Sequence, residues 1–311
     1  MSNDKPSVVL TTPALGFVEA LLIGRYRVIR GWEQPSDRPF TDARALVCLG
    51  NEPLGPFLDR CPALGLIACY TTGYDAIDLP AARARGLAVT HAPGATSHAV
   101  AEYALALTLA ALRNLVAGDR MVRAGEWKAG PVTIGRSLVD ARLGIVGLGD
   151  IGHELGRLAQ ALGTTVAWWG PRPKPAVEWP RAATLLELAT QSDVLAICAR
   201  ADESNRGLIS AEVIDAVGPS GLIVNVARGQ LIDETALIAA LQNRRLGGAA
   251  LDVFESEPTP AARWIDVPGV IATPHIGGAS IHGTTKMTTM LLENLARYFS
   301  GEPLATPVAH S

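Results

Sequence analysis

The chain is poor in cysteine and in aromatic residues, and neither sign of charge prevails in it. Its 311 residues include four cysteines, none of them in a C-x-x-C pair. Such a set argues against a disulfide framework or a structural zinc site and is typical of the reducing cytosol. With 27 basic and 30 acidic residues and no basic stretch, the chain has no electrostatic footprint for nucleic acid or an anionic membrane. We therefore expect neither as a partner.

Long hydrophobic runs are absent as well. The most apolar stretch, residues 99–116, contains Glu102 and Arg113, so it predicts a helix buried on all sides and not a membrane span. The opening MSNDKPSVVL lacks a basic segment followed by an apolar one, so we expect no signal peptide and a cytoplasmic protein. No group of His, Cys and acidic residues has metal-ligand spacing, so no metal site is expected.

Short apolar runs alternate with helical patterns along most of the chain. This alternation predicts an α/β fold with two doubly wound parallel-sheet domains, whose strands are covered by helices on both faces. Residues 92–94 are rich in helix breakers and indicate a linker. A last helix, 284–299, is expected to pack back on the first domain. The predicted strands are 8–10, 45–49, 64–68 and 87–90, then 143–146, 165–169, 194–198, 222–226, 249–253 and 270–272.

A G-x-G-x-x-G loop follows the first strand of the second series and precedes a helix predicted at 151–162. In such a loop the first glycine permits a tight turn, the second lets the backbone approach a pyrophosphate, and the third lets helix and strand pack closely. The helix N-terminus then presents free N–H groups to the phosphates. The predicted cofactor contacts here are Gly147, Gly149, Asp150, Ile151 and Gly152.

The end of the next strand bears on the choice between NAD and NADP. An Asp or Glu about 20 residues past the glycines would hold the ribose 2′-hydroxyl. Gly170 stands there instead, followed by Arg172 and Lys174. Two cations and no carboxylate predict a cofactor with a 2′-phosphate, NADP, with NADPH preferred over NADH. The alternative is that Arg172 and Lys174 are solvated loop charges.

Three further strands end in polar motifs. Arg228 lies in NVARG, Glu257 closes LDVFESE, and His275 lies in TPHIGG. A guanidinium fits a carboxylate bidentately, and an imidazole is the usual general acid or base, which a bonded carboxylate would keep protonated. Taken singly, each residue could be an ion-pair partner, a solvated acid or a structural histidine. Their shared place at the carboxyl ends of strands favours an acid–base site.

The order GLGDIG, NVARGQLIDETAL, ALDVFESEP and TPHIGGAS resembles the D-isomer-specific 2-hydroxyacid dehydrogenases, and TTGYDAIDLPAARARGLAVTHAPGATSHAVAEYALAL extends the resemblance upstream. The resemblance implies a dinucleotide-binding domain, 96–283, inserted into a discontinuous substrate-binding domain, 1–95 plus 284–311. It also implies a cleft between them, a homodimer, and NAD(P)-dependent interconversion of small 2-oxo and 2-hydroxy acids.

Carried over by position, the resemblance gives each polar residue a role. Arg228 would bind the substrate carboxylate and polarise the keto group. His275 would give its proton to the carbonyl oxygen during reduction, and Glu257 would hold His275 and support its protonated form. The other implied contacts are the N–H groups of Thr72 and Gly73 at the substrate carboxylate, and Ala227, Asp252 and Gly277 at the cofactor, with Asp252 near the nicotinamide carboxamide.

The chain also departs from the family pattern. Thr71 stands where the family often has glycine, His91 where asparagine is common, and Arg200 follows a strand without the usual proline. Gly170 followed by Arg172 resembles the glyoxylate/hydroxypyruvate reductases that use NADPH, which makes these two acids the leading substrates. A nucleotide-sensing scaffold resembling the co-repressors, or oxidation of another anion such as formate or phosphite, is the alternative.

Overall fold

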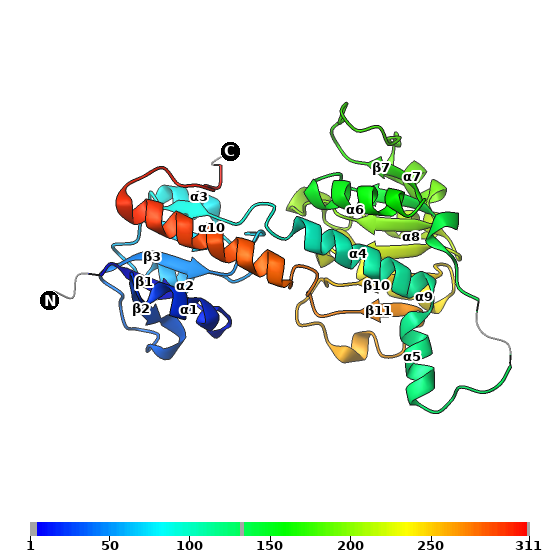
Figure 1. The fold of residues 1–311 in the computed structure, drawn as a ribbon, viewed down its shortest axis with the longest axis horizontal. Helices are drawn as coiled ribbons and strands as arrows, with labels where there is room; N and C mark the ends of the chain where they lie inside the picture. The colour runs from blue at the N-terminus through cyan, green and yellow to red at the C-terminus, as the bar shows by residue number, and fades with distance from the viewer. Residues whose placement is uncertain (1–4, 131–133, 310–311) are drawn as a thin grey trace. The chain divides into compact units, whose positions relative to one another are not determined.

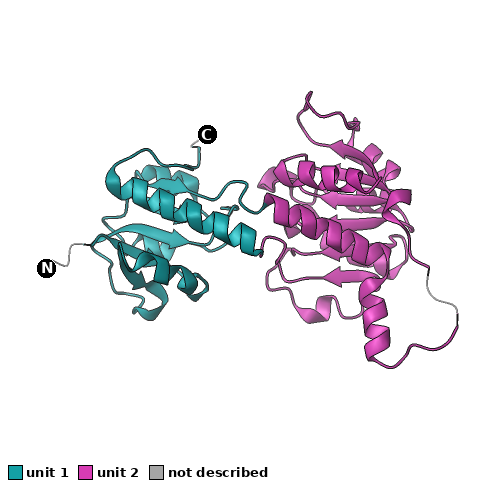
Figure 2. Ribbon diagram, viewed as in Figure 1, with its two compact units in different colours: residues 1–96, 280–311 teal, residues 97–279 magenta. Residues whose placement is uncertain are grey.

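The computed structural model describes residues 5–130 and 134–309, and the chain divides into two compact units (Figures 1 and 2). Unit 1 comprises residues 1–96 and 280–311, and unit 2 comprises residues 97–279. Each unit is built on one fully parallel sheet, so the expected fold class of two parallel α/β domains is confirmed. The substrate-binding and dinucleotide-binding roles expected for the two domains stay predictions.

Unit 1 contains a five-stranded sheet in the order β2-β1-β3-β4-β5. The strand β2 was not expected, because its sequence, RVIR, has a charged residue at each end. It lies at the edge of the sheet, where an arginine can reach solvent, so an apolar run is not required. The elements are β1 (Ser7–Leu10), α1 (Gly16–Leu22), β2 (Arg27–Arg30), β3 (Ala43–Cys48), α2 (Gly55–Leu58), β4 (Leu66–Cys69), α3 (Leu79–Ala84), β5 (Ala88–Thr90) and α10 (Ile281–Ser300).

Both faces of the unit 1 sheet are buried. Val8 and Leu10 point to a cluster that includes Leu291 and Leu295 of α10, whereas Val9 points to a second cluster on the other face. Successive strand residues alternate between faces, so a continuous apolar run is what a sheet covered on both sides requires. The last helix packs in unit 1 as expected, although it begins at Ile281, with the Ser280 side chain as its cap.

Unit 2 contains a six-stranded sheet in the order β11-β10-β9-β8-β6-β7. The order reverses at β6, and open parallel sheets bind ligands beyond the carboxyl ends of strands at such a point. Its elements are α4 (Ser97–Leu112), α5 (Leu115–Arg123), β6 (Arg142–Val146), α6 (Asp150–Ala161), β7 (Thr165–Trp169), α7 (Leu185–Gln191), β8 (Val194–Ile197), α8 (Ala211–Val217), β9 (Leu222–Asn225), α9 (Glu234–Gln242), β10 (Gly248–Leu251) and β11 (Val270–Ala272). Short 3-10 helices lie at Pro13–Leu15, Gly31–Glu33, Leu138–Asp140, Glu203–Asn205, Gly229–Leu231 and Ala261–Arg263.

The single helix expected at 99–116 is in fact two helices, α4 and α5. The chain breaks at Asn114, which has a left-handed backbone with φ 53°. The expectation of burial on all sides was wrong for the single chain: α4 packs on α6, β9 and β10, while its outer positions, such as Glu102 and Ala106, are exposed. Among the described residues, no single helix has the length and apolarity to cross a membrane. The pair α4 and α5 passes that test only together, across a 61° bend.

Candidate active site

The glycine loop between β6 and α6 has two glycines that the fold needs and one that it does not. Gly147 has φ 88°, and a Cβ there would lie 2.4 Å from Ala199 Cα. A Cβ on Gly152 would lie 2.3 Å from the Gly147 carbonyl oxygen. Gly149 has no atom within 4 Å of its Cβ position. The open space at Gly149 therefore lies at the N-terminus of α6, the place at which such loops generally bind a pyrophosphate.

The carboxyl end of β7 carries the residues expected to distinguish NADP from NAD. A Cβ on Gly170 would meet Trp168 at 3.4 Å, an ordinary contact, so neither packing nor backbone conformation requires glycine there. Arg172 and Lys174 are exposed, and neither forms an ion pair with any residue in 5–130 or 134–309. Arg181, which sequence reasoning missed, donates from Nη2 to the Gly170 carbonyl oxygen at 2.8 Å. Its backbone pairs with Trp168 as an isolated bridge, and its guanidinium lies over the Trp168 ring, so the position of Arg181 depends on tertiary contacts that its local sequence does not indicate.

The loop between β7 and α7 is irregular, and Trp179 ties it to α6. This indole packs on Gly156 of α6, where a Cβ would lie 2.4 Å from the ring. Its Nε1 donates to Gln160 Oε1 at 3.2 Å, and its carbonyl oxygen accepts from Trp168 Nε1 at 3.1 Å. The segment that carries the two loop cations is thus tied to the helix that follows the glycine loop.

The turn after β9 positions Arg228 through a buried asparagine. The Asn225 side chain donates from Nδ2 to the Arg228 carbonyl oxygen at 2.9 Å and accepts from the Ala227 N–H at 3.0 Å. Arg228 itself donates from Nη1 to the Ala227 carbonyl oxygen at 2.7 Å. Sequence reasoning did not single out Asn225, although a polar residue ending an apolar strand was a usable signal.

The turns after β9 and β10 touch each other. A Cβ on Gly229 would lie 1.8 Å from the carbonyl carbon of Phe254, so only glycine allows the two backbones to approach this closely. The second turn is held by Glu234, a buried residue that the sequence did not indicate. Its carboxylate accepts from the Glu255 N–H at 2.5 Å and lies 3.0 Å from Arg263 Nε.

Glu257 and His275 form a hydrogen-bonded pair. Glu257 Oε1 accepts from the Phe254 N–H at 3.0 Å, and Oε2 lies 2.7 Å from His275 Nδ1. Burial raises the pKa of Glu257, but the bonds from His275 and Phe254 and the charge of Arg228 outweigh it, so the net shift is downward. A carboxylate can only accept, so Nδ1 carries the hydrogen of this bond. The His275 side chain is 41% exposed and the Glu257 side chain is 32% exposed.

The backbone of His275 is strained, and Asp252 braces the turn that holds it. His275 has φ 54°, a conformation that costs a non-glycine residue about 1 kcal/mol or more. The buried Asp252 carboxylate accepts from the Thr273 hydroxyl at 2.7 Å and from the N–H groups of Ile276 and Gly277 at 2.9 and 2.7 Å. Both of its oxygens are therefore engaged within the turn, and its contact with a nicotinamide stays a prediction.

Glu154 on α6 lies within a charged cluster near the start of α4. Arg157 donates two hydrogen bonds to it at 2.9 and 2.7 Å, and His98 Nδ1 lies 2.6 Å from its Oε1. The hydrogen bonds from Arg157, followed by those from His98, lower the pKa of Glu154 to about 2. The cluster links α4 to the helix of the glycine loop.

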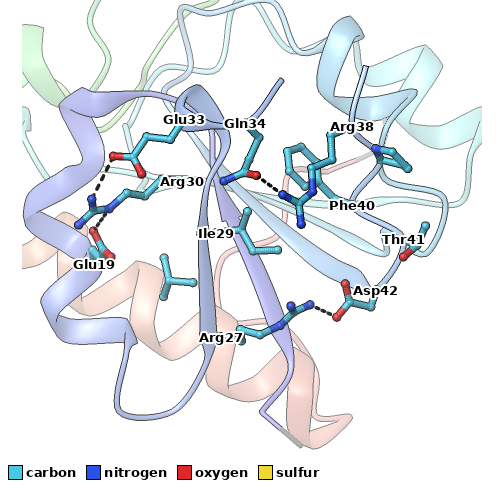
Figure 3. A pocket seen from close by; sticks show the side chains of 12 residues that line it. Glu19, Arg27, Ile29, Arg30, Glu33, Gln34, Arg38, Phe40, Thr41 and Asp42 are labelled. Atoms are coloured by element: carbon cyan, nitrogen blue, oxygen red, sulfur yellow. Dashed lines mark hydrogen bonds and ion pairs between the residues drawn. The ribbon is translucent and has the colours of Figure 1, made fainter. Parts of the chain in front are cut away.

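Unit 1 carries the predicted substrate contacts Thr72 and Gly73 in the loop after β4. It also has a hollow of about 420 Å³ along β2 (Figure 3). The hollow is polar, and its arginines Arg27 and Arg30 are paired with acidic neighbours. No chemistry is assigned to it. Among the described residues, no cluster of three His, Cys, Asp or Glu side chains is arranged to hold a metal ion.

Comparison with known proteins gives a consistent result. Residues 105–277 match the family model "D-isomer specific 2-hydroxyacid dehydrogenase, NAD binding domain". A hydroxyphenylpyruvate reductase from Plectranthus scutellarioides is 34% identical over 307 residues, covering 97% of this chain and 98% of its own. A glyoxylate/hydroxypyruvate reductase from Arabidopsis thaliana is 33% identical over 309 residues, with the same coverage.

A solved structure is similar over nearly the whole length. It is an NADPH-dependent glyoxylate/hydroxypyruvate reductase from Sinorhizobium meliloti in complex with NADP and malonate, with a TM-score of 0.90 and 31% identity. The match covers 98% of this chain and 97% of that one. Sequence and structure therefore point to the same group of proteins.

Proposed function

Because the chain belongs to the D-isomer-specific 2-hydroxyacid dehydrogenase family, we propose that it reduces a small 2-oxo acid, such as glyoxylate or hydroxypyruvate, to the D-2-hydroxy acid with NADPH. Its membership makes it an oxidoreductase, and its relatives support reduction of 2-oxo acids. The observation that carries the proposal is the 2.7 Å bond between Glu257 Oε2 and His275 Nδ1.

His275 is the proton donor in this proposal. Glu257 holds Nδ1, which leaves Nε2 to give a proton to the carbonyl oxygen as negative charge develops there. Glu257 is suited to this task because its lowered pKa keeps it ionised at neutral pH. In the oxidation direction the same Nε2 takes the proton from the hydroxyl group.

Arg228 binds the substrate carboxylate and polarises the keto oxygen. Its planar guanidinium can bind a carboxylate bidentately, which fixes the orientation of the 2-oxo acid. Asn225 holds the backbone of the turn, so the guanidinium starts from a defined position. Fixed donors of this kind stabilise a developing oxyanion without reorganisation.

A nicotinamide cofactor, when bound, supplies the hydride for C2 of the oxo acid. The open space at Gly149 and the free N-terminus of α6 fit its pyrophosphate. Gly170, Arg172 and Lys174, with Arg181 beside them, support NADP over NAD, because cations and no carboxylate stand where the 2′-phosphate would bind. A clear preference for NADH in kcat/KM would refute this part of the proposal.

The decisive experiment uses His275→Ala. Loss of a placed acid lowers kcat by about 10²–10⁴-fold, while the Kd of NADPH, measured by fluorescence titration, stays within about twofold. Wild type and variant are compared on glyoxylate, hydroxypyruvate, pyruvate and phenylpyruvate. Wild-type turnover by the variant would refute the assignment. If the wild type turns over none of the four acids, the result would favour a nucleotide-sensing scaffold or an enzyme that oxidises formate or phosphite.

A homodimer and a cytoplasmic location belong to the same proposal. Leu115 and Val122 lie two turns apart on α5, and both are exposed, as is Trp127 beyond the helix. Exposed apolar side chains that lie on one surface are typical of protein–protein contacts. The helix α4, which immediately precedes α5 in the sequence, also has a partly exposed outer side. Light scattering of the wild type and of Val122→Glu tests the dimer, since a buried charge should shift the protein to monomer. The four free cysteines suit a reducing compartment.

A further inference from the structure

The loop after β4 has three successive carbonyl groups that are all engaged within unit 1. The Thr71 carbonyl oxygen accepts from the Ala92 N–H at 3.1 Å. The Thr72 carbonyl oxygen lies 2.9 Å from His91 Nδ1. The Gly73 carbonyl oxygen accepts from the Thr71 hydroxyl at 2.8 Å. Side chains at 71 and 91, where the chain departs from its family's pattern, thus hold two of the three.

This arrangement decides where the amides of the loop point. In a trans peptide the N–H is directed opposite to the carbonyl of the same unit. The N–H groups of Thr72 and Gly73 therefore face away from the partners of the Thr71 and Thr72 carbonyls. Within residues 5–130 and 134–309, neither N–H donates a hydrogen bond. Adjacent backbone amides left unpaired in this way are suited to an anion.

His91 is fixed as a donor to this loop. A carbonyl oxygen only accepts, so the contact with Thr72 requires hydrogen on Nδ1. The imidazole stands edge-on to the Tyr74 ring with 4.9 Å between centroids. Its backbone is paired in both directions with Thr306, at 3.3 Å for the His91 N–H and 2.6 Å for its carbonyl oxygen. The ring therefore has little freedom to turn away.

Thr71 completes the support from the side of β3. Its hydroxyl accepts a hydrogen bond from the Gly50 N–H at 2.9 Å and donates one to the Gly73 carbonyl oxygen. Gly50 is required here, because a Cβ would lie 1.7 Å from that carbonyl oxygen. The loop is thus held from two sides, by a hydroxyl and by an imidazole.

We infer that His91 is a positioning residue for the substrate: by holding the Thr72 carbonyl, it directs the Gly73 N–H at the carboxylate of the 2-oxo acid. The inference rests on the proposed function, which sets that carboxylate against Thr72 and Gly73. A donor fixed in advance loses no freedom when the anion binds, so affinity rises. Thr71 supports the next carbonyl in the same way.

The test compares His91→Leu with His91→Asn. The two side chains have similar shapes, but only asparagine can donate to the Thr72 carbonyl. The Kd of oxalate, a carboxylate that does not react, is measured by calorimetry with NADP⁺ present, and KM and kcat are measured on the best oxo acid. His282→Leu, at an exposed histidine of unit 1, is the matched control.

In the leucine variant, KM and the oxalate Kd should rise about tenfold to a hundredfold, as expected if the hydrogen bond from the misdirected Gly73 N–H to the charged carboxylate is lost. The effect on kcat should be smaller, because binding in the ground state is lost along with that in the transition state. The asparagine variant should recover most of the affinity. The Kd of NADPH should be unchanged in all variants.

Two outcomes overturn the inference alone: a leucine variant with wild-type KM and oxalate Kd, or an asparagine variant as impaired as the leucine one. A wild type that neither binds oxalate nor reduces any oxo acid overturns the proposed function, and the inference with it. If His91→Leu does not fold, His91→Ala replaces it as the variant that cannot donate to the Thr72 carbonyl. The alanine variant should then have a higher KM and oxalate Kd than the asparagine variant, and equal values for the two would refute the inference.

Discussion

Gly170→Asp should turn the cofactor preference from NADPH towards NADH. The position tolerates a side chain, because a Cβ there meets only the Trp168 ring, at 3.4 and 3.8 Å, and the backbone is not in the left-handed region. The new carboxylate would stand at the carboxyl end of β7, where such a group binds the ribose hydroxyls in NAD-dependent proteins. The fold should therefore survive a change that alters the charge at this strand end.

The magnitude follows from the charges involved. A carboxylate about 5 Å from a phosphate charge, at an effective dielectric between about 20 and 80, is repelled by about 1–3 kcal/mol. This corresponds to a fivefold to 150-fold loss in affinity for NADPH, at about 1.4 kcal/mol per tenfold. A new hydrogen bond to the 2′-hydroxyl should improve binding of NADH by about tenfold.

The assay is kcat/KM for both cofactors at a saturating oxo acid, with the inhibition by 2′,5′-ADP relative to 5′-AMP as a measure of binding of the 2′-phosphate. Gly170→Ala is the control, since it adds the Cβ without the charge. Thermal melting checks that both variants fold. Equal effects of alanine and aspartate would mean that bulk, and not charge, is responsible. An unchanged NADPH to NADH ratio would refute the placement of the phosphate at this strand end.

Three further predictions, which use four substitutions, concern unit 2. Gly149→Ala should keep the melting temperature and weaken NADPH binding, whereas Gly152→Ala should destabilise the fold, because its Cβ would lie 2.3 Å from a carbonyl oxygen; equal melting temperatures would contradict this. Arg157 holds the pKa of Glu154 at about 2, so the stabilisation from this carboxylate is complete above its ordinary pKa and is lost as pH falls towards 2. Melting curves of wild type and Glu154→Gln should therefore converge in acid, and a constant difference would exclude the linkage. Arg181→Ala should raise the Ki of 2′,5′-ADP about two- to fivefold, the value of an exposed ion pair, without changing that of 5′-AMP, which lacks the 2′-phosphate.

The sequence determined most of the strands and the glycine loop, because these depend on local properties. Strands 165–169 and 270–272 have the predicted limits, since each is a short apolar run next to turn-forming residues. The edge strand β2 escaped prediction because exposure at the edge removes the apolar pattern. The break between α4 and α5 at Asn114 was not predicted, because a single residue with a left-handed backbone does not change the helix-forming composition around it.

The sequence also supplied the polar motifs, and with them the family. Their roles in catalysis stay predictions, but the structure shows which of them meet. Glu257 and His275 come from turns after different strands, and the parallel sheet sets both at the same edge. No pattern in either motif encodes the 2.7 Å distance between them, because it depends on strand register and on the close contact at Gly229.

The supporting residues were decided by tertiary structure alone. Arg181, Glu234 and His91 act on backbone groups that are distant in sequence, and each is an ordinary polar residue in its own segment. Hydrophobic periodicity and the need for glycine in a tight turn are local properties, so they can be read directly from the sequence. The pairing of a side chain with a remote carbonyl or amide exists only after the sheets are assembled, and it is this pairing that gives the polar groups their direction.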